Sequence, residues 1–179
     1  MAVLISMQKV FLNGDFIDKD SAKISIFDRG FIFGDGIYEV VPVINRVMVE
    51  KQGFWDRFKR SLSEIDLSLP YSKDEFENIL NELIKINSLN EGGIYIQITR
   101  GIAQRDFSFV SGITPTVMAF AFSDSVLEHP GAKSGITIIS TPDIRWKRRD
   151  IKSISLLGQC YANNQATIAG ADECFMVED

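Results

Sequence analysis

The stretch YEVVPVINRVMVE, residues 38–50, determines the fold class predicted for the first part of the chain. Its Val and Ile residues lie on both sides of Asn45, which is the pattern of two strands joined by a turn. Upstream, KVFLNGDFI (residues 9–17) places the pair Asn13-Gly14, typical of tight hairpin turns, between two apolar runs. The sequence from 8 to 49 therefore predicts a β-meander.

The segment between these strands is FDRGFIFGDGIYEV, residues 27–40. Three glycines, Gly30, Gly34 and Gly36, predict that no regular element forms here. Asp28 and Asp35 can supply local hydrogen bonds in turns. We expect an aromatic, glycine-rich loop that passes close to another group.

Two amphipathic helices are predicted next. The first covers residues 54–67, and the second opens at Ser72 and ends between 87 and 92. GGIYIQITRG (92–101) then reads as an alternating strand, and TPTVMAFAF (114–122) as a strand buried on both faces. Sheet and helices together predict an α+β domain.

The segment after this domain is punctuated by Ser, Pro and Gly. We expect an N-terminal domain at 1–123, a linker at 124–135 and the beginning of a second domain at 136–179. That beginning holds a strand, a basic loop, a helix over 156–169 and a final strand start. These few elements can bury only a small core, so we expect a truncated chain or one that needs a partner. In an isolated chain, we expect several apolar side chains to be exposed to solvent, such as Ile138, Leu157, Phe175 and Val177.

Composition excludes several classes of protein. The 179 residues include 19 Lys and Arg against 24 Asp and Glu, a net charge of −5, which argues against nucleic acid as a partner. No apolar run approaches the roughly 18 residues of a membrane span, and the N-terminus MAVLISMQKV does not have the pattern of a signal peptide. We expect a cytoplasmic protein that does not associate with membranes.

Cysteine and histidine are scarce. Cys160 and Cys174 are predicted to be buried free thiols. The single histidine, His129, lies in the predicted linker. This argues against Ser-His-Asp and Cys-His chemistry and against multi-histidine metal sites, so we predict no metal centre.

Four residues are candidates for chemistry, and each also has a structural explanation. Lys152 follows a cluster of cations and precedes an apolar helix, which can lower the pKa of an amine and make it a nucleophile; it can equally belong to a solvated basic loop. Arg57, near the start of the first helix, can bind a phosphate or be a surface charge. Arg105, beside Phe107, can bind a carboxylate or pair with Asp106.

Tyr38, the fourth candidate, follows the glycine-rich segment directly. It can line a site beside that segment. The simpler explanation is a half-buried aromatic side chain on a strand.

Four stretches together resemble one family: RGFIFGDGIYEV, FWDRFKRSL, TRGIAQRDFSF and RWKRRDIKSISLL. They occur here in the order found in the class IV, fold-type IV, pyridoxal-phosphate aminotransferases, and the similarity is greatest to the D-amino-acid aminotransferases. The resemblance implies the N-terminal α+β domain of that fold, followed by the start of its larger α/β cofactor domain. It also implies pyridoxal 5'-phosphate as cofactor and a homodimer.

The resemblance further implies a role for each candidate. Lys152 is implied to form the Schiff base with the cofactor and to carry the proton between the substrate and the cofactor. Arg57 matches the phosphate-binding arginine and Tyr38 the pocket tyrosine. Arg105 matches the arginine that binds the substrate carboxylate on a loop donated by the neighbouring subunit.

The chain departs from the family at several positions. Phe54 and Phe107 stand where histidines are usual, and Asn163 stands near a usual lysine. The acidic residue that pairs with the pyridine nitrogen comes about thirty residues after the lysine in the family, whereas this sequence ends at Asp179.

We expect transamination between a D-amino acid such as D-alanine and a 2-oxo acid such as 2-oxoglutarate. Branched-chain aminotransferase and aminodeoxychorismate lyase activities remain open within the family. A truncated, non-catalytic dimerising domain is the alternative from another functional class.

Overall fold

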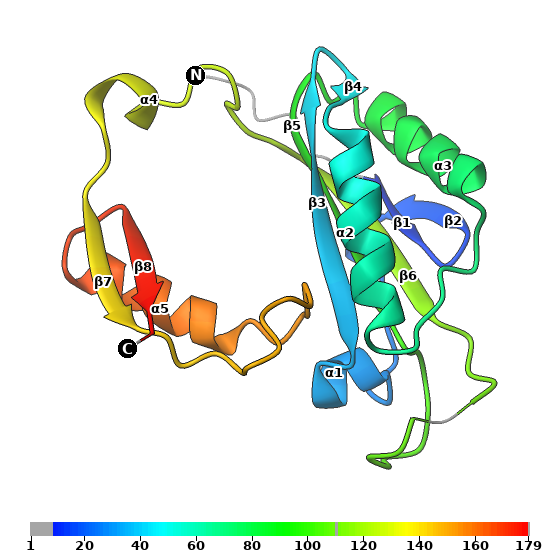
Figure 1. Ribbon diagram of the computed structural model, residues 1–179. Helices are drawn as coiled ribbons and strands as arrows, with labels where there is room; N and C mark the ends of the chain where they lie inside the picture. Colours follow the sequence, from blue (N-terminus) through cyan, green and yellow to red (C-terminus); the bar gives the residue numbers. More distant parts are fainter. Residues whose placement is uncertain (1–8, 110, 179) are drawn as a thin grey trace. The chain divides into compact units, whose positions relative to one another are not determined.

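The chain forms two compact units in the computed structural model, which describes residues 9–109 and 111–178 (Figure 1). The first unit extends to Val126 and also takes in Ile151–Ile154. The second comprises Leu127–Asp150 and the chain from Ser155 onward. The prediction that MAVLISMQKV is not a signal peptide concerns mostly residues 1–8, which lie outside the described range.

The first unit is built from strands, helices and one 3-10 turn. Its described elements are β1 (Lys9–Leu12), β2 (Asp15–Asp18), η1 (Lys19–Ser21), α1 (Arg29–Phe33), β3 (Gly36–Ile44), β4 (Val47–Met48), α2 (Lys51–Ser63), α3 (Lys73–Ile86), β5 (Glu91–Thr99) and β6 (Thr116–Ser123). The predicted α+β class is confirmed.

The strands pair into one antiparallel sheet in the order β2-β1-β6-β5-β3-β4. Asn13 and Gly14 both have positive φ values, 51° and 110°, in the tight turn between β1 and β2, as the sequence predicts. The single meander predicted for residues 8–49 is wrong. The β1–β2 and β3–β4 hairpins lie at opposite ends of the sheet, because β5 and β6 insert between them, and strand patterns carry no information about partners.

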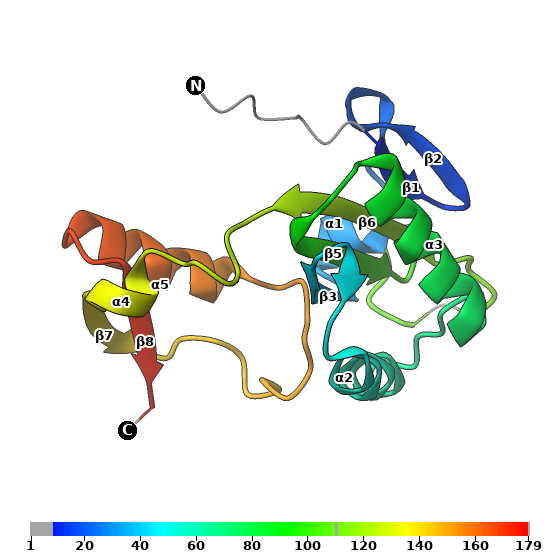
Figure 2. The same ribbon diagram turned by 90° about the horizontal axis from the view of Figure 1, so that it is seen from above.

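The hydrophobic core lies between one face of this sheet and the helices α2 and α3 (Figure 2). Alternate residues of β3 and β5, such as Ile37, Val41 and Ile96, are fully buried on that face. Helix α2 begins at Lys51 and ends at Ser63, earlier at both ends than the predicted range 54–67. The predicted start of α3 is confirmed by a capping box.

The capping box at α3 satisfies backbone donors at the helix start. The Ser72 side chain accepts from the Glu75 amide, and the Glu75 carboxylate accepts from the Ser72 amide at 2.8 Å. These hydrogen bonds lower the pKa of Glu75. The local sequence thus determines where this helix begins.

The second face of the sheet is more open. Phe120 on β6 is 36% exposed, so the prediction that this strand is buried on both faces is wrong. An apolar run can be mistaken for a doubly buried strand when its outward residues are aromatic, as they are here at Phe120 and Phe122. These rings continue a row of aromatic side chains across β3, β5 and β6.

The glycine-rich segment does contain a regular element, contrary to expectation. The helix α1 spans Arg29–Phe33 and is capped by Asp28, whose side chain accepts from the Gly30 amide at 2.8 Å. Gly34 ends the helix in the left-handed conformation, with φ 68°. The glycines therefore bound a short helix instead of preventing one.

The second unit contains α4 (Gly131–Ser134), β7 (Ile138–Pro142), α5 (Leu157–Ile168) and β8 (Glu173–Val177). Strands β7 and β8 pair in parallel, and α5 packs against both. Several apolar side chains of this unit are exposed, as expected: Ile138, Leu157, Phe175 and Val177. Both cysteines are free, but Cys160 is exposed on α5 and Cys174 is only partly buried, so the prediction of two buried thiols is wrong.

Candidate functional site

Lys152 lies in an extended segment at the exposed edge of β3. The Tyr38 amide donates to the Lys152 carbonyl at 2.9 Å, the Ile154 amide donates to the Gly36 carbonyl at 3.2 Å, and Ile37 and Ser153 form an isolated β-bridge. From α2, the Ser61 hydroxyl accepts from the Lys152 amide at 3.2 Å. Backbone contacts with β3 and α2 thus fix the position of Lys152, whereas the sequence indicated a solvated loop or a helix start.

The Lys152 amine lies over the ring of Tyr38. The distance from Nζ to the ring centroid is 4.3 Å, a cation–π geometry. The structure describes no ion pair or hydrogen bond for this amine within residues 9–109 and 111–178. An amine held this way remains available to another group.

Tyr38 belongs to a row of stacked rings on the open face of the sheet. Its ring stacks on Tyr95 at 5.6 Å between centroids, and Tyr95 stacks on Phe120 at 4.9 Å. Burial of the phenol, with a further contribution from Tyr38, raises the pKa of Tyr95 to about 12. Tyr95 donates to the Gln97 side chain at 3.0 Å. The stack restricts the Tyr38 ring beneath the Lys152 amine.

Arg57 is bound by a carboxylate of the sheet. Its Nε and Nη2 donate to the two oxygens of Glu39 at 3.0 and 2.9 Å, and Glu39 has no solvent exposure. The hydrogen bonds to Glu39 raise the pKa of Arg57. The sequence predicted that this helix begins close to Arg57. It begins earlier, at Lys51, so Arg57 lies in the second turn of α2.

The Arg57 guanidinium keeps one free nitrogen. Its Nη1 makes no hydrogen bond within the described residues, and a Cβ on Gly53 would lie 3.9 Å from this nitrogen and 3.7 Å from the Glu50 carboxylate. Arg57 is also four residues before Ser61, hence one helical turn of about 5.4 Å from the side chain that binds Lys152.

Arg105 lies apart from these residues, in the loop after β5. Its guanidinium lies 5.6 Å from the Phe33 centroid and 5.2 Å from that of Phe107. The described residues show no pairing of Arg105 with Asp106, whose carboxylate accepts instead from the Ser108 amide at 2.7 Å. The structure therefore brings Lys152, Tyr38 and Arg57 to neighbouring elements but leaves Arg105 outside the group.

The basic loop before Lys152 is largely neutralised by carboxylates. Asp143 accepts from Arg145 and from Arg149, each at 2.7 Å at the closest. The hydrogen bonds from Arg145 in particular hold the pKa of Asp143 well below its usual range. Arg148 pairs with Asp150. The cations expected to surround Lys152 are thus engaged with acidic partners.

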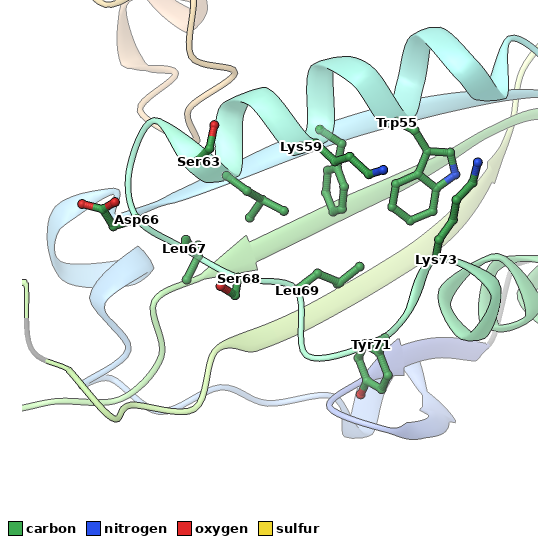
Figure 3. A pocket seen from close by; sticks show the side chains of 11 residues that line it. Trp55, Lys59, Ser63, Asp66, Leu67, Ser68, Leu69, Tyr71 and Lys73 are labelled. Carbon is green, nitrogen blue, oxygen red and sulfur yellow. The ribbon is translucent and has the colours of Figure 1, made fainter.

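A hollow of about 560 Å³ lies elsewhere in the first unit, between α2 and the segment 66–73 (Figure 3). Its lining includes Trp55, Lys59, Tyr71 and Lys73, and the two lysine amines lie within 6.0 Å of the Trp55 ring centroid. None of the four predicted site residues lines it.

Sequence reasoning missed three residues of the site. Glu39 could have been found from the sequence, because a lone carboxylate within the apolar run of β3 indicates a buried and paired charge. Ser61 and Tyr95 carried no such signal: a serine in an amphipathic helix and a tyrosine in a strand are ordinary. Only the packing of α2 and β5 on β3 reveals their contacts.

Comparison with known proteins places this geometry in a family. The chain matches amino-transferase class IV over residues 36–179, a span that holds Tyr38, Arg57, Arg105 and Lys152. The chain belongs to this family. The D-alanine aminotransferase of Staphylococcus haemolyticus is 44% identical over 168 residues, which cover 93% of this chain and 59% of that protein.

A second D-alanine aminotransferase, from Bacillus licheniformis, is 36% identical over 171 residues, 96% of this chain and 60% of that protein. The chain thus spans about three fifths of the length of these relatives. The crystal structure of the branched-chain amino acid aminotransferase of Escherichia coli shares the fold, with a TM-score of 0.81 at 17% identity over 96% of this chain and 58% of that one.

Membership of the family implies pyridoxal phosphate as the cofactor. Between residues 9 and 178, apart from Val110, no helix is long and apolar enough to cross a lipid bilayer.

Proposed function

We propose that this chain is part of a pyridoxal-phosphate-dependent aminotransferase that transfers the amino group of D-alanine, or a similar D-amino acid, to a 2-oxo acid. The observation that carries the proposal is the Lys152 amine, held 4.3 Å from the Tyr38 ring centroid by backbone pairing with β3. The relatives named D-alanine aminotransferase, at 36% to 44% identity, support the choice of substrate.

The residues present fit the cofactor at two points. Lys152 offers an amine without an ionic partner, as covalent attachment of an aldehyde requires. Arg57 offers Nη1 to a phosphate while Glu39 fixes the rest of its guanidinium.

Each residue has a separate task in the proposed reaction. Bound pyridoxal phosphate supplies a conjugated ring that withdraws electrons from the substrate α-carbon. Lys152 would hold the cofactor through Nζ, and the same Nζ, once the substrate amine has released it, would move the proton between the substrate α-carbon and the cofactor. Tyr38 orients Nζ through its ring face, and Arg57 would hold the cofactor phosphate in a fixed position.

Arg105 binds the substrate carboxylate in this proposal. It lies outside the group formed by Lys152, Tyr38 and Arg57, in line with its donation to the site of a second copy of the chain. A homodimer is therefore part of the proposal. So is a cytoplasmic location, because cysteines usually stay unpaired in that reducing compartment, as both do here.

Preferential labelling of Lys152 tests the proposal directly. The chain is incubated with substoichiometric pyridoxal phosphate, reduced with borohydride and mapped by mass spectrometry. We expect much more phosphopyridoxyl label on Lys152 than on Lys59, Lys73 and Lys147. In the Arg57→Ala variant, the label on Lys152 should decrease. Equal labelling of all exposed lysines would favour the non-catalytic dimerising domain.

Substrate tests then separate the enzymes of the family. Conversion of D-alanine to pyruvate in the presence of 2-oxoglutarate supports the proposed substrate, with L-alanine as the matched control. Turnover of L-valine or L-leucine instead would support a branched-chain aminotransferase, and release of pyruvate from aminodeoxychorismate would support the lyase. Lys147→Ala, in the same basic loop, should leave the activity unchanged, whereas Lys152→Ala should abolish it.

A further inference from the structure

The loop that carries Arg105 packs against the short helix α1. Arg29, the first residue of α1, donates from Nη1 to the backbone carbonyl of Asp106 at 2.5 Å. Its side chain is only 2% exposed. A buried guanidinium bound to a backbone carbonyl holds the loop itself, independently of the loop's side chains.

A shared carboxylate fixes Arg29 in turn. Asp35 Oδ2 accepts from Arg29 Nε at 2.7 Å and from Arg100 Nε at 2.8 Å, and all three side chains are at least nine-tenths buried. Arg100, at the start of the loop between β5 and β6, also lies 3.8 Å from the centroid of Phe109. The part of the loop that carries Arg105 is therefore held on both sides, at Arg100 and by the contacts of Asp106 and Phe109.

The Arg105 side chain is held by aromatic faces. Phe33, the last residue of α1, and Phe107 lie 5.5 Å apart between centroids, and the Arg105 guanidinium lies within 5.6 Å of both. No hydrogen bond or ion pair to Arg105 occurs among the described residues. A cation–π contact occupies no hydrogen-bond acceptor of the protein, so the guanidinium donors remain available to a carboxylate, which arginine binds bidentately.

We propose that α1 is the positioning element for Arg105: Arg29 holds the loop backbone, while Phe33, with Phe107, holds the guanidinium by cation–π contacts and leaves its donors to the substrate carboxylate. The inference rests on the proposed function, because the carboxylate is that of the amino acid. Phe33 is then a positioning residue that acts through Arg105.

The first test measures the loop alone, in the full chain. Phe33→Leu should speed amide hydrogen exchange over residues 102–109 and trypsin cleavage after Arg105 by several-fold. Phe33→Tyr, which keeps the ring, should behave like the parent. Phe31→Leu is the matched control, since Phe31 lies on the same helix, is 70% exposed and contacts no other ring among the described residues. Equal rates in Phe33→Leu and Phe31→Leu would overturn the proposal.

The second test is the effect on substrate binding. In transamination, Phe33→Leu should raise the KM for D-alanine several-fold with a smaller change in kcat. Phe33→Tyr should keep the KM of the parent. A looser loop with an unchanged KM would show that α1 does not position Arg105 for substrate. If Arg105→Ala itself leaves the KM unchanged, the proposed role of Arg105 fails, while the exchange rates still decide whether α1 holds the loop.

Discussion

Arg57 on α2 donates two hydrogen bonds to the fully buried carboxylate of Glu39 on β3. The pair joins the helix that carries the proposed phosphate ligand to the strand that carries Tyr38. A cation usually read as a surface charge is therefore a structural link between α2 and the sheet.

Arg57→Ala should destabilise the fold as well as weaken binding of the cofactor. Removing the arginine leaves the Glu39 carboxylate buried without its main donor, which costs about 1–3 kcal/mol of unfolding free energy. The sequence alone indicated a surface charge or a phosphate ligand, and neither explanation predicts this loss of stability. Urea unfolding of the parent and the variant measures the difference.

The matched control is the double variant Arg57→Ala with Glu39→Gln. Because the buried charge is then gone, most of the lost stability should return, while retention of pyridoxal phosphate should stay low. Unchanged urea midpoints in all the variants would show that the ion pair contributes nothing to folding.

Tyr95 should ionise later than an ordinary tyrosine. Burial raises its pKa to about 12 in the folded chain, against about 10 when unfolded. A raised pKa means that its stabilising contribution is complete below pH of about 10 and is lost as the pH rises through about 12. Absorbance of phenolate during alkaline titration should show this late step, and Tyr95→Phe should remove it. Loss of an early step instead would contradict the buried stack.

Asp143 should make its loop sensitive to acid. Hydrogen bonds from Arg145 depress the pKa of this carboxyl group, so its contribution is present above the unfolded pKa of about 3.9 and declines as the pH falls toward the folded value. Protection of the Arg145 amide, which donates to Asp143 at 2.9 Å, should weaken only in strong acid. In Asp143→Asn that protection should be low and independent of pH. Acid-dependent protection in this variant would assign the effect to another group.

Gly36→Ala should displace the segment that holds Lys152. A Cβ at this position would lie 2.5 Å from the Ile98 carbonyl oxygen and 3.1 Å from the Ile154 side chain. We expect a loss of about 1–3 kcal/mol of unfolding free energy and weaker labelling of Lys152 by pyridoxal phosphate. Gly53→Ala is the control, since its Cβ meets atoms only at 3.7 Å and beyond and should stabilise α2 by about 0.5–1 kcal/mol.

Local sequence patterns predicted the elements well but not their partners. The cap at Ser72 and the turn at Asn13-Gly14 follow from short-range hydrogen bonding, so both were predictable. The separation of the two hairpins and the pairing of the Lys152 segment with β3 depend on contacts between distant residues, which no local period encodes. The role of Lys152 came from the family resemblance, since its position in a basic loop fits several explanations.

The return of Ile151–Ile154 to the first unit bears on synthesis of the chain. Residues 36–38 of β3 gain their edge partner only after the whole segment 127–150 has been translated. The first unit therefore cannot complete its fold before residues 127–150 of the second have been made, although N-terminal domains generally fold first. The segment that carries the proposed catalytic lysine is thus the last part of the first unit to be added.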